Sequence, residues 1–279
     1  MLKNTFVHME GIGERTEIFL WSNGIITWED CDEAGLRKVV GEGAAKKISM
    51  WAEKSLSCLD SGDHSFFSRT VPYEHVWRGW KSFGNRIGYL DIETTGLSPQ
   101  LSKVTVVGVY DGEDVHSYVH GKNMDEFFAD ISKYSVLVTF NGKAFDIPFL
   151  KKHYPEVNFN HLHIDLRPVL KSLGIAGGLK KIEPLFGLER MGDMAGLTGY
   201  DAVKMWNRYE YNHDEAALDR LVRYNAEDIL SLKPIMEWVF EKKSAEIRAK
   251  MRRADADGET GKEPSGDAAL TGIATLARQ

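Results

Sequence analysis

Two acidic side chains stand two residues apart in the segment YLDIETTG, at Asp91 and Glu93. The β-branched and aromatic residues around them predict a strand at 87–93, in which residues two apart face the same side. Adjacent carboxylates raise each other's pKa unless a cation lies between them, and oxygen ligands suit Mg²⁺ or Mn²⁺. An isolated Asp-x-Glu pair is usually a solvated strand face. The tight turn predicted at Thr94-Thr95-Gly96 favours a metal site instead.

A third acid, Asp146, follows an apolar stretch that predicts a buried strand at 136–141. Asn141-Gly142 would end this strand. Pro148 suits the first turn of a helix, because its missing N–H would be unpaired there in any case. Asp146 is therefore expected near a helix start, where it either binds a metal or interacts with the helix dipole.

Tyr224 and Asp228 are four residues apart in a helix predicted at about 214–240. Residues at i and i+4 share a helix face, so the phenol and the carboxylate can converge on one point. Glu227 lies about 100° away around the helix and is expected to face solvent. Such a pair is common in helices and indicates a functional site only together with the three acids.

The elements expected around these residues define the fold class. Strands are predicted at 87–93, 104–110, 115–119, 136–141 and 162–166, with a hairpin turn at Asp111-Gly112 and a helix at 124–133. An antiparallel hairpin followed by strands that alternate with helices predicts a mixed sheet covered by helices, an α/β fold.

Taken together and in this order, the four acids and the tyrosine resemble the signature of the tyrosine-containing DEDD exonucleases, Asp-x-Glu, Asp and Tyr-x-x-x-Asp. The segments LDIETTGLS, VTFNGKAFDIPFL, HIDLR, GGLKKIE and YNAEDILSL more closely resemble the YprB-like branch of RNase H-like proteins. The resemblance covers residues 87–240. It implies an RNase H-like five-stranded mixed sheet flanked by helices.

The same resemblance implies a metal-dependent 3′–5′ exonuclease that hydrolyses phosphodiester bonds at ends of single-stranded DNA or RNA. Two Mg²⁺ or Mn²⁺ ions about 4 Å apart would activate water and stabilise the leaving 3′-oxygen. Tyr224, with an ordinary pKa of about 10, suits orienting the water. The metal ligands would be Asp91, Glu93, Asp146 and Asp228, and the residues nearby expected to contact nucleic acid are Thr94, Thr95, Asn141 and Phe145.

A smaller N-terminal unit is expected at residues 1–60, where two glycine-containing segments resemble helix-hairpin-helix motifs. In such motifs a Gly-x-Gly turn lets backbone amides approach a phosphate at a helix start. Acidic residues outnumber basic ones in this unit, so it either binds nucleic acid or is a structural helical cap. The candidate contacts are Gly11 and Gly13 in the first segment, and Gly41, Gly43, Lys46 and Lys47 in the second.

Composition bounds the remaining possibilities. The chain of 279 residues is 43% hydrophobic and 27% charged, with a net charge of −6 and two cysteines, which excludes a disulfide framework. No signal peptide or apolar run of about 18 residues occurs, so a soluble cytoplasmic protein without membrane contact is expected. Residues 61–86 are predicted to form a connector, 87–245 the catalytic domain and 246–279 a disordered tail.

Two alternatives to exonuclease activity remain open. One keeps the fold and the metals but cuts internally, as an RNase H-like endonuclease. The other is a nucleic-acid-binding module without catalysis, although a complete set of acids argues against lost activity. The residues do not separate DNA from RNA, and they identify no protein partner.

Overall fold

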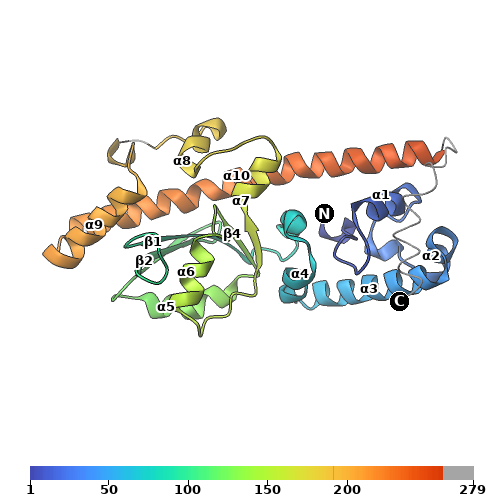
Figure 1. Cartoon of the computed structure of the whole chain (residues 1–279), viewed down its shortest axis with the longest axis horizontal. Coiled ribbons are helices and arrows are strands. Elements are labelled where there is room, and N and C mark those ends of the chain that lie inside the picture. Colours follow the sequence, from blue (N-terminus) through green and yellow to red (C-terminus); the bar gives the residue numbers. More distant parts are fainter. Residues whose placement is uncertain (191, 260–279) are drawn as a thin grey trace. The chain divides into compact units, whose positions relative to one another are not determined.

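The computed structural model describes residues 1–190 and 192–259, with side chains as far as residue 252. The described chain divides into two compact units, residues 83–239 and residues 1–82 together with 240–259. The larger unit holds all five strands (Figure 1).

The larger unit is built on one mixed sheet with the order β3-β2-β1-β4-β5. β1 pairs antiparallel with β2 and parallel with β4; β2–β3 is antiparallel and β4–β5 parallel. This confirms the expected five-stranded α/β fold flanked by helices. The strands are β1 (Ile87–Thr94), β2 (Val104–Tyr110), β3 (Val115–Val119), β4 (Val136–Thr139) and β5 (Leu162–Asp165).

Helices cover both faces of this sheet (Figure 1). Leu90 and Ile92 of β1 pack with α5 and α6. Val106 of β2 packs on the opposite face, against α9 and the first part of α10. The helical elements are α5 (Met124–Asp130), η4 (Ile131–Lys133), α6 (Asp146–His153), α7 (Leu166–Ser172), α8 (Leu179–Ile182), η5 (Glu183–Phe186), η6 (Gly192–Met194), α9 (Gly199–Asn212) and α10 (Glu215–Glu259).

The smaller unit is helical. A buried ion pair joins Glu17 to Arg78 at 2.9 Å, and Glu17 also accepts from the backbone N–H of Phe6 at 2.7 Å. Its elements are η1 (Leu2–Asn4), α1 (Glu14–Ser22), η2 (Trp28–Asp30), α2 (Glu33–Val40), α3 (Glu42–Asp60), α4 (His64–Thr70) and η3 (Tyr73–Gly79).

The two glycine segments of this unit differ. Gly41 (φ 78°) joins α2 to α3, so helices flank this turn on both sides. Gly13 begins α1, but only a three-residue 3-10 helix and a turn precede it. The first segment is therefore not a hairpin between two α-helices.

The last helix is longer than its composition predicts. α10 continues to Glu259, so the expected disorder from residue 246 does not hold for 246–259, and 260–279 lie outside the described residues. The buried side chains of Ile247 and Met251, four residues apart, continue an apolar stripe that favours a helix. Within the described residues, no helix is both long and apolar enough to cross a membrane.

Gly108 of β2 lets α10 approach the sheet closely. A Cβ built at this position would lie 1.9 Å from Oδ1 of Asn225 and 3.2 Å from Ile229, both on α10. Any side chain at position 108 would therefore displace the side chain of Asn225 or push α10 away from the strand.

We expect Gly108→Ala to lower the free energy of unfolding by about 1–3 kcal/mol, the usual cost of overpacking a core. Urea denaturation of the full chain measures it. Gly199→Ala is the matched control, because a Cβ at Gly199 meets no atom within 4 Å. Equal stability of the two variants would contradict a close approach at Gly108.

Candidate active site

Three carboxylates from distant parts of the chain converge beside β1. Asp91 and Glu93 share the face of β1 that α10 covers, and Asp228 faces them from α10. One oxygen of each lies within 4.8 Å of the others. Glu93 and Asp228 are each 7% exposed, and Asp91 is half-buried. Because of the expected strand alternation, Asp91 and Glu93 lie on one face of β1. On this face they meet Asp228, the acid of the Tyr-x-x-x-Asp pair.

Asp146 approaches the group from a different element. It is the first residue of α6, is 2% exposed, and accepts a hydrogen bond from the backbone N–H of Ile92 at 3.1 Å. Ile92 lies between Asp91 and Glu93, so this bond fixes Asp146 beside the two acids of β1. Asp146 does not belong to the group of three acids within 4.8 Å.

Two cations and an amide near these acids had not been assigned to the site from sequence. Lys180 donates to the hydroxyl of Tyr224 and its Nζ lies 4.0 Å from the centre of that ring. Arg190 contacts Asp228, and Asn225 donates to Asp91 at 3.0 Å. The glycine pair before Lys180 was a signal for a turn near the site. Arg190 follows a segment without hydrophobic period and had no such signal.

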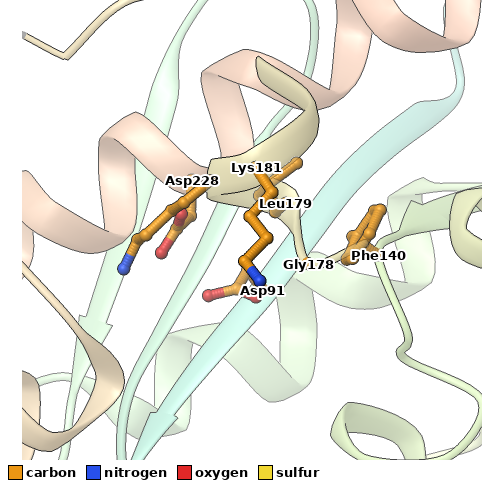
Figure 2. A pocket seen from close by; sticks show the side chains of 7 residues that line it. Asp91, Phe140, Gly178, Leu179, Lys181 and Asp228 are labelled. Atoms are coloured by element: carbon orange, nitrogen blue, oxygen red, sulfur yellow. The ribbon is translucent and has the colours of Figure 1, made fainter. Parts of the chain in front are cut away.

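A cleft of about 350 Å³ opens onto two of the acids, Asp91 and Asp228. Figure 2 shows Asp91 of β1 and Asp228 of α10 facing this space, with the turn at Gly178 and Leu179 beside them. Its lining consists of Asp91, Phe140, Gly178, Leu179, Lys180, Lys181 and Asp228.

The four residues expected to contact nucleic acid near the acids make local contacts in the structure, and their contact with nucleic acid stays a prediction. The hydroxyl of Thr94 donates to the carbonyl of Gly96 at 2.6 Å, and that of Thr95 accepts from the N–H of Lys103 at 2.9 Å. Asn141 adopts a positive φ of 66° and accepts from Arg167 at 2.7 Å, while Phe145 packs on the core. None of the four lines the cleft.

The model for the RNase H superfamily matches residues 88–240, more than half of the chain. The chain belongs to the RNase H superfamily. No curated protein matches the chain. Three solved structures with some likeness to it are each 17% identical.

A family B DNA polymerase from the hyperthermophilic archaeon Pyrobaculum calidifontis gives a TM-score of 0.45 over 55% of this chain. The match spans only 24% of that polymerase's length. Brucella melitensis NrnC bound to pGG gives a TM-score of 0.39, and the match covers 69% of this chain and 83% of NrnC. The apo form of a nuclease gives a TM-score of 0.41, and the match covers 75% of this chain and 88% of that nuclease.

Burial and mutual repulsion dominate the electrostatics of the RNase H domain. Burial, with repulsion from the neighbouring acids, raises the pKa of Asp91 and Glu93 well above the usual range. Burial also raises the pKa of Asp228, against the opposing effect of Arg190, and raises that of Asp146 to about 7. A bound cation would relieve this repulsion.

The donor set of the RNase H domain fits a hard divalent cation. The three clustered donors are all carboxylates, the ligand type that Mg²⁺ and Mn²⁺ prefer. Asn225 already holds one oxygen of Asp91, which orients that ligand before any ion binds.

In the presence of chelator, we expect the free energy of unfolding to fall as pH rises from 5 to 8. The folded pKa of Asp146, about 7, lies above its ordinary 3.8, so the unfolded chain ionises first and the folded state loses stability across this interval. That difference corresponds to at most about 4 kcal/mol. Asp146→Asn removes the ionisation and should flatten the decline.

Urea denaturation at several pH values measures the decline. Asp201→Asn is the control, because the pKa of Asp201 is lowered to about 2 by hydrogen bonds from Thr198, and it stays ionised throughout the interval. A decline as steep in Asp146→Asn as in wild type would contradict the raised pKa.

Proposed function

We propose that this protein is a metal-dependent 3′–5′ exonuclease of the tyrosine-containing DEDD group, in its YprB-like branch, acting on single-stranded ends of DNA or RNA. The observation that carries the proposal is the convergence of Asp91, Glu93 and Asp228 within 4.8 Å. Tyr224 lies one turn before Asp228 on α10, and Asp146 accepts a hydrogen bond from the backbone N–H of Ile92 in β1.

In this proposal, Asp91, Glu93, Asp146 and Asp228 hold two divalent ions, Mg²⁺ or Mn²⁺. When bound, such ions lower the pKa of water and stabilise negative charge on the leaving oxygen. The four carboxylates would neutralise the ions and exclude bulk water from them, since three of the four are nearly buried.

Tyr224 is proposed to orient the attacking water. Its ring is buried and its oxygen accepts a hydrogen bond from Lys180. The phenolic hydrogen therefore remains available to donate to another oxygen, which suits fixing a water rather than removing its proton. The ammonium of Lys180 also adds positive charge to a cleft whose other charged lining residues are Asp91, Asp228 and Lys181.

Incubation with end-labelled DNA and RNA oligonucleotides tests the proposed activity. With Mg²⁺ or Mn²⁺, we expect single nucleotides to be released from the 3′ end, and chelator to stop their release. Internal cuts in a circular single strand would indicate an endonuclease instead. Binding without cleavage would indicate a binding module.

Asp91→Ala is expected to abolish hydrolysis while the chain stays folded, because it removes a metal ligand. Tyr224→Phe is expected to cost much less, within the roughly 10²–10⁴-fold range of a group that handles protons, because all four acids remain. Single-turnover kinetics with circular dichroism of each variant provide the measurement. Turnover by Asp91→Ala would contradict the metal site, and a wild-type rate in Tyr224→Phe would leave the tyrosine a packing role.

The turn between α2 and α3 is proposed as a second nucleic-acid contact. Gly41 begins the 19-residue α3 with exposed backbone, Lys46 is exposed on the first turns, and Lys47 is half-buried. Amides at a helix start and nearby lysines together favour a phosphate.

Lys46→Gln with Lys47→Gln is therefore expected to weaken binding of a long single strand and reduce the slope of log affinity against log salt. Each lost phosphate contact should change the slope by about 0.7 for a single strand. The measurement uses Asp91→Ala protein, so that no substrate is consumed. Lys204→Gln on α9, an exposed lysine paired with Asp201, is the control. Unchanged slope and affinity would leave the smaller unit a structural cap.

A further inference from the structure

Arg190 makes a buried bridge between two acids. Its side chain is 9% exposed. Nε donates to one oxygen of Glu183 at 2.9 Å and Nη2 to the other at 2.6 Å. This bidentate pairing fixes the plane of the guanidinium. Nη2 also donates to Oδ1 of Asp228. Arg190 therefore holds one oxygen of a proposed metal ligand.

Glu183 is itself held from the other side. It is 2% exposed, and Ser231 donates to its Oε1 at 2.7 Å. Ser231 lies on α10, three residues after Asp228, and so on the next turn of the same helix. The chain of bonds from Ser231 through Glu183 and Arg190 to Asp228 therefore begins and ends on α10.

This arrangement has two consequences for the acid cluster. The carboxylate of Asp228 is fixed through Oδ1, which leaves its other oxygen for an ion. Glu183 is occupied by Arg190 and Ser231, which keeps a fifth carboxylate from joining the site. Because Glu183 and Arg190 are opposite in charge, the pair orients Asp228 and adds little net charge beside it.

We infer that Arg190 is a positioning residue for Asp228, and that Glu183 and Ser231 hold Arg190 in place. The inference rests on the proposed function, since it takes Asp228 as a metal ligand. Hydrogen-bond partners of metal ligands typically change metal affinity by about 10–100-fold when they are removed. A guanidinium that only competed with the ion for Asp228 would have the opposite effect, so the sign of the change decides.

Titration of the full-length protein with Mn²⁺, followed by electron paramagnetic resonance of the free ion, tests the inference without any nucleic acid. We expect Arg190→Met to weaken Mn²⁺ binding about 10–100-fold. The Mn²⁺ affinity of Arg190→Lys should lie between those of wild type and Arg190→Met, because an ammonium can contact Asp228 but cannot form the bidentate pairing with Glu183. Arg208→Met is the matched control: Arg208 also binds a carboxylate through Nε and Nη2, at 3.0 and 2.5 Å, but on the surface with Asp214.

Arg190→Met also leaves Glu183 buried without its cation, so folding needs a separate control. In the double variant Arg190→Met, Glu183→Gln, position 183 carries no charge, so no carboxylate is left buried there without its cation, and we expect Mn²⁺ binding to stay weak. Binding as tight as wild type in the double variant, or unchanged or tighter binding in Arg190→Met, would overturn the inference. Failure of the proposed function is visible separately, as wild-type protein that binds Mn²⁺ and cleaves no oligonucleotide.

Discussion

The gathering of four carboxylates, three of them buried, is the constraint on which the RNase H domain depends. Removing charges from water is costly unless partners compensate them. Here Asp91, Glu93 and Asp228 each have an oxygen within 4.8 Å of the others, a repulsion that Arg190 offsets at Asp228. The raised pKa values of Asp91, Glu93, Asp146 and Asp228 express this cost. Such an arrangement lowers stability in the protein alone and would be stabilised by bound cations, which is typical of a site adapted to function rather than to folding.

Close packing of α10 on the sheet makes this burial possible. Gly108 leaves room for Asn225, whose amide reaches Asp91 at 3.0 Å. The buried face of α10 thus positions Tyr224 and Asp228 together, since residues at i and i+4 share a helix face, and it is wide enough to bury Asn225 as well. A small shift of α10 away from β2 would separate Asp228 from the acids of β1.

Both units contain a buried Arg–Glu pair, but the two pairs differ in whether the arginine also contacts another acid. In the smaller unit, Arg78 binds both oxygens of Glu17, which also accepts from the backbone N–H of Phe6. That pair includes no other acid and serves the helical core. In the larger unit, Arg190 extends from Glu183 to Asp228, so the same chemistry connects a structural pair with the candidate active site.

The sequence by itself determined the fold class, the strands and the candidate acids, because local rules govern them. Strand alternation placed Asp91 and Glu93 on one face, and helical spacing placed Tyr224 with Asp228. Composition, rather than these local rules, predicted disorder at 246–259, where α10 continues. The composition of this segment does not reveal an apolar stripe that consists of so few residues, Ile247 and Met251. The glycine spacing predicted two hairpins, and the turn at Gly41 has α-helices on both sides whereas the one at Gly13 does not.

Only the tertiary structure decided which cations and amides meet those acids. Lys180 lies 44 residues from Tyr224 along the chain, and Arg190 lies 38 residues from Asp228. Asn225 lies 134 residues from Asp91. No periodicity relates positions so far apart, because their contacts depend on how α10 and the segment after α8 pack. The acids could therefore be identified from local spacing, whereas their partners depended on packing between distant segments.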